Sequence, residues 1–166
     1  MFRQYLSTTP LLDFSNPAIQ ALVKENGWAT LSTDLRIGAV YDFVRNEILF
    51  GFNARDTLTA SQVLEEGYGH CNTKTTLLMA LLRAVDVPCR FHGFTIAHRV
   101  QRGIIPDVVY PVVSKNLLHG WAEVFFEGQW IELEGFVLDY EILNALQDAF
   151  PDTERLCAYG VGTDRL

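Results

Sequence analysis

The chain has 166 residues, 49% of them hydrophobic, and a formal net charge of −7 at pH 7. That length suits a single domain with one core, and no stretch approaches the roughly 20 apolar residues that a bilayer span needs. Affinity for nucleic acid comes mainly from Lys and Arg side chains that neutralise phosphates, so the negative charge argues against a nucleic-acid partner.

The N-terminal residues and the cysteines indicate the compartment. The first ten residues lack the basic and apolar regions of a signal peptide, and we expect a cytoplasmic protein with no membrane partner. Cys71, Cys89 and Cys157 are an odd number of widely spaced cysteines, so we expect free thiols. Together with Cys89, His92 and His98 match no zinc-binding spacing, and we expect no metal and no cofactor.

Three helices are predicted in the first part of the chain. Asn16 and Pro17 are typical of a helix start and Gly27 of a stop, which predicts a helix over residues 17–25. Ser32–Asp34 forms a second cap cluster. Apolar residues follow it at helical spacing, namely Ile37, Val40, Tyr41, Val44 and Ile48. A loop is predicted over residues 51–56, and a short helical turn over residues 60–65.

The segment from Gly67 to Val85 organises the rest of the chain. Gly67 and Gly69 predict a tight turn, and the apolar residues after Cys71 recur with a helical period. Cys71 therefore lies at a predicted helix start. The free amide hydrogens and the positive end of the helix dipole favour a thiolate there, so we expect Cys71 to be reactive.

Strands dominate the next part of the sequence. Residues 89–96 are rich in aromatic and branched side chains, which predicts a strand, and residues 98–115 predict a long loop of the kind that is often functional. Residues 117–126 and 129–134 predict a hairpin around Glu127-Gly128. A last helix is predicted over residues 139–149, ended by Pro151.

The register of that hairpin suggests a catalytic group. With the turn at Glu127-Gly128, Trp121 is predicted opposite Glu134, which makes His119 and Glu134 diagonal neighbours on one face. A nucleophile at a helix start, an imidazole and a carboxylate are the three parts of covalent acyl chemistry. In this hypothesis Cys71 attacks a carbonyl carbon, His119 takes the thiol proton and later protonates the leaving amine, and Glu134 orients His119.

Other interpretations of the same residues stay open at this point. A cysteine on a helix is often a small buried apolar side chain, and a strand histidine often only bonds a backbone group. Glu134 is also compatible with a solvated strand position. His70, next to the nucleophile, suits a second base or a side chain that points to solvent.

The sequence resembles the transglutaminase-like family at two separate blocks. The first runs from Gly69-His-Cys71 through Leu81-Leu-Arg-Ala84 to Pro88-Cys-Arg90, and the second comprises His119-Gly-Trp-Ala-Glu-Val124 and Trp130-Ile-Glu-Leu-Glu134. The resemblance covers roughly residues 35 to 140. The family usually has aspartate where this chain has Glu134, so Asp139 is an alternative for the acid that orients the histidine.

The resemblance implies the fold and the activity. We expect an α+β, papain-like fold with the cysteine on a central helix packed against a small antiparallel sheet, in one domain over residues 1–166. It also implies a cysteine-dependent acyl-transfer enzyme with a peptide or protein amide as substrate. We favour hydrolysis over crosslinking, because no accessory modules are visible. The alternative is a catalytically silent member of the family that serves as a binding module. The sequence predicts no oligomeric state.

Overall fold

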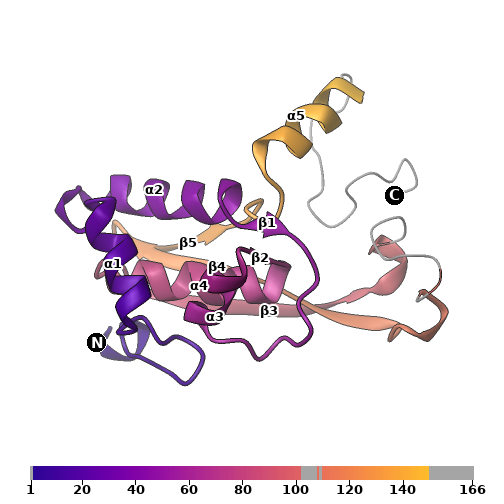
Figure 1. Cartoon of the computed structure of the whole chain (residues 1–166), viewed down its shortest axis with the longest axis horizontal. Coiled ribbons are helices and arrows are strands. Elements are labelled where there is room, and N and C mark those ends of the chain that lie inside the picture. The colour runs from indigo at the N-terminus through magenta and orange to yellow at the C-terminus, as the bar shows by residue number, and fades with distance from the viewer. Residues whose placement is uncertain (1, 102–107, 109, 150–166) are drawn as a thin grey trace.

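A computed structural model describes residues 2–101, 108 and 110–149 of the chain (Figure 1). Its elements in chain order are α1 (Pro17–Glu25), α2 (Thr33–Asn46), β1 (Leu49–Phe50), α3 (Ala60–Glu66), β2 (Tyr68–Gly69), α4 (Cys71–Ala84), β3 (Cys89–Ala97), β4 (Asn116–Phe126), β5 (Gln129–Leu133) and α5 (Tyr140–Ala149). Short 3-10 turns lie at Arg3–Tyr5, Trp28–Thr30, His98–Gln101 and Tyr110–Val112. The mixture of helices with a small antiparallel sheet confirms the predicted fold class.

The predicted helices are all present, and local side chains explain where they begin. The Oδ1 atom of Asn16 accepts a hydrogen bond from the Ala18 N–H at 2.9 Å, which caps α1. Gly27 follows that helix with a φ of 65°, a left-handed conformation that glycine adopts at low cost. The side chains of Thr59 and Gln62 exchange hydrogen bonds with each other's backbone N–H at the start of α3.

The central helix, α4, carries much of the core. Its apolar side chains are fully buried over nearly two turns, at Leu77, Leu78, Ala80, Leu81 and Leu82. The first three helices and the sheet all contact it, and Figure 1 shows it between them. A helix that is apolar on nearly every side has to be enclosed, which explains its central place.

The sheet has the order β3-β4-β5, and both pairings are antiparallel. Phe126 pairs with Gln129 and Val124 pairs with Ile131, so the predicted hairpin register is confirmed. The ladder ends one residue earlier than predicted, because β5 stops at Leu133, which pairs with Ala122. Glu134 therefore lies just beyond the strand, and Gly135, with a φ of 80°, turns the chain away.

The two faces of the sheet have different surroundings. Helix α4 packs against the face that carries Cys89, Ala122 and Val124, all of which are buried in the core. The thiol of Cys89 donates a hydrogen bond to the carbonyl of Met79 in α4 at 3.4 Å. Alternation along β4 places His119 and the other odd-numbered residues of this strand on the opposite face.

A short parallel pair of strands was not predicted. Leu49 pairs with Tyr68, and Phe50 pairs with Gly69. The N–H of Gly51 also donates to the carbonyl of Gly69 at 3.0 Å. These contacts hold the loop at residues 51–59 beside the start of α4, where Cys71 lies.

The arms of the β3–β4 hairpin extend past the start of α4 (Figure 1). The N–H of His98 donates to the carbonyl of Lys115 at 2.9 Å and closes the segment predicted as a loop, whose described ends form 3-10 turns. Residues 102–107, Pro151 and Cys157 lie outside the described residues. In the described part of the chain, no helix is both long enough and apolar enough to cross a membrane.

Candidate active site

Cys71 is the first residue of α4, and its side chain is almost entirely enclosed. Its exposed fraction is 8%. His70 precedes it as the cap residue, and the His70 N–H donates to Oγ1 of Thr73 at 3.0 Å. The carbonyl of Cys71 accepts a hydrogen bond from Thr75, which also donates to the carbonyl of Gly120 in β4 at 3.3 Å. The start of the helix is therefore fixed against the strand that carries His119.

The sulfur of Cys71 has polar groups on several sides. Its S–H donates to Oδ1 of Asn72 at 3.7 Å, and Nδ1 of His70 lies 3.9 Å from it. Backbone N–H groups of Asn72, Gly120 and Cys71 itself also face the sulfur and lower its pKa. Burial has the larger effect and raises the pKa to about 11. The prediction of a resting thiolate is therefore wrong for this structure, because the helix start is buried.

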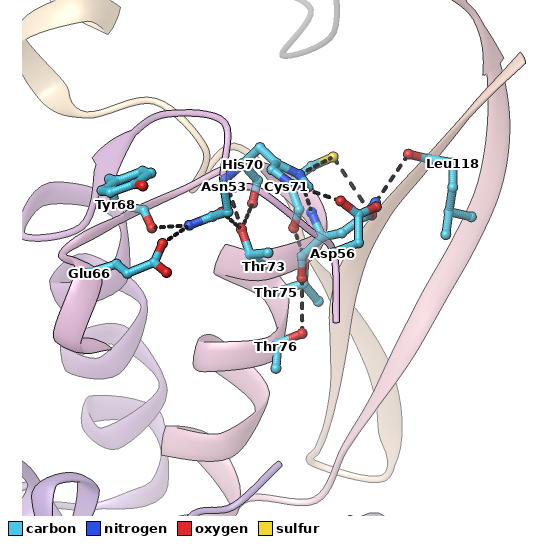
Figure 2. A network of polar contacts seen from close by, with 11 residues as sticks. Asn53, Asp56, Glu66, Tyr68, His70, Cys71, Thr73, Thr75, Thr76 and Leu118 are labelled. Atoms are coloured by element: carbon cyan, nitrogen blue, oxygen red, sulfur yellow. Dashed lines mark hydrogen bonds and ion pairs between the residues drawn. The ribbon is translucent and has the colours of Figure 1, made fainter. Parts of the chain in front are cut away.

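His70, the residue before Cys71, is held by the carboxylate of Asp56 beside the Cys71 thiol (Figure 2). Its Nε2 lies 3.1 Å from Oδ1 of Asp56, and its Nδ1 accepts from the N–H of Asn72 at 3.4 Å. The side chain of Asn72 donates to Oδ2 of Asp56 at 3.0 Å and to the carbonyl of Leu118 at 3.4 Å. Asn72 thus joins the loop, the helix start and β4.

The loop that carries Asp56 is anchored by a second set of contacts. Asn53 accepts from Oγ1 of Thr73 at 2.6 Å through its Oδ1 atom, and its amide donates to Glu66 at 2.7 Å and to the carbonyl of Tyr68 at 3.1 Å. Figure 2 shows this network running from α3 to the start of α4. It fixes the position of the loop relative to Cys71.

His119 lies on β4 next to Gly120, whose N–H faces the Cys71 sulfur. The His119 side chain is buried, and burial lowers its pKa to about 4. The ring of Phe94 packs edge-on against the imidazole, with 5.3 Å between centroids. The imidazole is therefore predominantly neutral at pH 7, which is the form that a general base needs.

Glu134 shares a small pocket with His119. The pocket is lined by His119, Gly120, Trp121, Glu134, Gly135, Phe136 and Val137. The backbone of Glu134 is held there because its carbonyl accepts from the Tyr41 hydroxyl at 2.6 Å. Asp139, the alternative acid, has its charge close enough to Lys74 to raise the pKa of that lysine. The role of Glu134 as the orienting acid, with Asp139 as the alternative, stays a prediction.

The other residues considered from the sequence have different surroundings. Cys89 is fully buried, and burial raises its pKa to about 11, so it is a core residue as expected. His92 lies on the outer face of the sheet and stacks on Trp121 at 4.5 Å. Its Nδ1 also lies 3.1 Å from Oε1 of Glu123.

A cluster that the sequence analysis missed lies around Glu123. Ligand atoms of His92, Glu123 and Glu132 lie within 4.8 Å of one another, as at a metal site. Arg90 forms an ion pair with Glu123, however, and lowers the pKa of that carboxyl. Because a cation already occupies this carboxylate, the cluster is explained as an ion-pair network. Arg90 and Glu123 are cross-strand partners in β3 and β4, a register that was not predicted from the sequence.

Comparisons with known proteins agree with the fold. The family model of the transglutaminase-like superfamily matches residues 20–135, and the search of curated proteins found no match. A crystal structure of a candidate cysteine protease from Cytophaga hutchinsonii superposes with a TM-score of 0.61 at 21% identity. The match covers 86% of this chain but only 44% of that protein, so this chain spans less than half of its length. The family match includes Cys71, His119 and Glu134 and most of the chain, and the protein belongs to the transglutaminase-like superfamily.

Proposed function

We propose that this protein is a cysteine-dependent enzyme that cleaves amide bonds through a thioester at Cys71. The observation that carries the proposal is the position of the Cys71 sulfur. It lies at the start of a central helix, among three backbone N–H groups, one of which belongs to the residue after His119. Such donors stabilise negative charge that develops during acyl transfer.

The proposed reaction has two halves. In the first, the sulfur attacks the amide carbon, the C–N bond breaks, and the thiol proton ends on the leaving amine. In the second, water adds to the thioester, releases the acid and returns a proton to the sulfur. His119 is the acid–base group that serves the leaving amine and the water, and Glu134 orients it. The pocket shared by His119 and Glu134 supports this pairing.

The side chains around Cys71 favour a peptide or protein substrate with an apolar side chain next to the cleaved bond. Phe52 is 54% exposed, and its ring lies 5.9 Å from that of His70. Leu118 is also 54% exposed, and its carbonyl accepts from the residue after Cys71. Exposed apolar side chains on segments that contact His70 and Asn72, the two neighbours of the nucleophile, are suited to contact an apolar group of the substrate.

The function is tested with a library of quenched peptide amides that vary in the residue before the cleaved bond. We expect wild-type turnover that Cys71→Ala abolishes and that His119→Ala lowers by at least about 100-fold. Cys89→Ala should keep activity, since that thiol lies in the core. Equal turnover by wild type and Cys71→Ala would contradict the proposal. Added primary amine separates hydrolysis, which we favour, from transfer, because only transfer yields the amine adduct.

The alternative is a catalytically silent binding module. One observation favours it, namely that burial opposes the charged forms of both Cys71 and His119. A silent module would show no turnover with any amide, and its Cys71 would form no acyl adduct. A buried thiol and a neutral imidazole still suit an enzyme in which proton transfer accompanies attack.

A further inference from the structure

We infer that His70, oriented by Asp56, is a second general base at the nucleophile and accepts the proton of the Cys71 thiol. This inference rests on the proposed function, and it leaves His119 to serve the leaving amine and the incoming water. The thiol would then have its own imidazole–carboxylate pair, separate from His119 and Glu134.

The first argument is the tautomer of His70. Its Nδ1 accepts from a backbone N–H, so that nitrogen carries a lone pair. Its Nε2 lies 3.1 Å from a carboxylate oxygen of Asp56 and therefore carries the hydrogen. An imidazole fixed in this way presents an unprotonated nitrogen to the helix start. That nitrogen lies 3.9 Å from the Cys71 sulfur.

The second argument is that capping alone does not explain this geometry. A helix cap needs only a side-chain acceptor, which Ser, Thr, Asp or Asn supplies with a shorter side chain. For the cap, a neutral hydrogen-bond acceptor on the far nitrogen would keep Nδ1 unprotonated equally well, so the negative charge of a carboxylate there adds nothing. It does stabilise an imidazolium, which forms when the ring takes a proton. Asp56 is in turn held by the side chain of Asn72 at 3.0 Å.

The third argument is enclosure. The exposed fraction of His70 is 8%, and Phe52 packs against its ring. In the described part of the chain, the charged group that affects its pKa is Asp56, which raises it, whereas burial lowers it more strongly. The ring is therefore neutral near pH 7 and able to accept a proton at Nδ1.

The proton transfer balances without another reactant. As the sulfur forms a bond to an electrophilic carbon, the S–H proton moves to Nδ1 of His70, and the imidazolium that results is paired with Asp56. That proton leaves with the amine as the C–N bond breaks, and the attacking water supplies the proton that returns to the sulfur when the thioester is cleaved. The weak hydrogen bond from the Asn72 N–H to Nδ1, at 3.4 Å, has to break during this transfer so that Nδ1 can accept the proton.

The test is the rate of iodoacetamide alkylation at Cys71 between pH 5 and 9, measured by peptide mass in the full chain. His70→Gln keeps an acceptor for the cap but cannot take a proton, and Asp56→Asn keeps a bond to the ring without the charge. We expect the wild-type rate to fall on the acid side, below about pH 6.5. In His70→Gln, the alkylation rate of Cys71 at pH 7 should be at least tenfold lower than in the wild type, and the fall of the rate on the acid side should disappear. In Asp56→Asn the rate should decrease by a smaller factor.

Two outcomes would overturn the inference: an unchanged Cys71 profile in His70→Gln, or loss of the inflection in His119→Gln instead. Alkylation of Cys89 in the same samples, with urea unfolding of each variant, controls for loss of structure. The readout needs no turnover, so it separates the two proposals. A wild type that cleaves no amide refutes the proposed function, whereas Cys71-dependent cleavage with a His70-independent profile refutes only this inference.

Discussion

The ammonium of Lys74 donates a hydrogen bond to the carbonyl of Ile48 at 2.7 Å, and this contact ties the helix of Cys71 to the chain that follows α2. Lys74 is fully buried, and burial lowers its pKa to about 7. Its Nζ also donates to the carbonyls of Arg45 at 3.3 Å and Val137 at 3.1 Å. One side chain thus satisfies three carbonyls from two segments, the end of α2 and the chain after β5.

Replacing that lysine should destabilise the fold. Lys74→Met keeps the apolar stem and leaves three carbonyls without their donor, so we expect a loss of about 3 kcal/mol in the free energy of unfolding. Lys24→Met, at an exposed position on α1, is the matched control and should change it by less than about 0.5 kcal/mol. Urea unfolding measures both. Equal midpoints for Lys74→Met and wild type would mean that the buried ammonium contributes nothing.

The stability of the protein should depend on pH through His119. Burial lowers its pKa from the ordinary value of 6.5 to about 4 in the folded protein, so the unfolded chain binds more protons between these values. The free energy of unfolding therefore falls as the pH drops from 6.5 to 4, by up to about 3 kcal/mol from this group. His119→Gln should show a shallower dependence in urea unfolding at several pH values. Parallel curves for the two proteins would contradict the buried neutral imidazole.

Gly120 should not tolerate a side chain. A Cβ atom there would lie 2.2 Å from the ring of Phe91 and 2.9 Å from the carbonyl oxygen of His92. We expect Gly120→Ala to cost about 2 kcal/mol in the free energy of unfolding and to lower activity, because the Gly120 N–H faces the Cys71 sulfur. Gly38→Ala is the control. A Cβ atom at Gly38, which lies on helix α2, would meet no atom within 4 Å, so this variant should raise the free energy of unfolding by about 0.5 to 1 kcal/mol. If Gly120→Ala is as stable as the wild type, β3 can move to accommodate the added methyl group and the prediction is wrong.

The sequence was sufficient for elements with a clear period or a clear cap. The helix at residues 17–25 was predicted to the residue, and the hairpin register followed from the Glu127-Gly128 turn. The pairing of β1 with β2 was missed, because two residues per strand show no alternation. In the site, the helix start at Cys71 was predicted, but burial of the thiol depends on what packs over it. The contact between His70 and Asp56 could not be predicted either, since no local sequence pattern links the loop at residues 51–59 to the cap of α4.

The apolar side chains beside Cys71 should determine substrate preference. Phe52→Ser and Leu118→Ser each remove an exposed apolar side chain from a segment that contacts a neighbour of Cys71, His70 or Asn72. We expect the kcat/KM for peptides with an apolar residue before the cleaved bond to fall about tenfold, chiefly through KM, with little change for a small residue there. Leu35→Ser, at an equally exposed position on α2, is the control and should have no effect. If both variants keep the wild-type preference for an apolar residue before the cleaved bond, the substrate does not contact Phe52 or Leu118 and the prediction is wrong.

The central claim is that Cys71 carries the acyl group. The most direct measurement mixes the enzyme with a p-nitrophenyl ester, quenches the reaction in acid within seconds, and locates the acyl group by peptide mass. We predict a thioester on Cys71 in the wild type and in Cys89→Ala, and none at residue 71 in Cys71→Ala. An unmodified Cys71 in an enzyme that still releases p-nitrophenol, at the same rate as Cys71→Ala, would contradict the account.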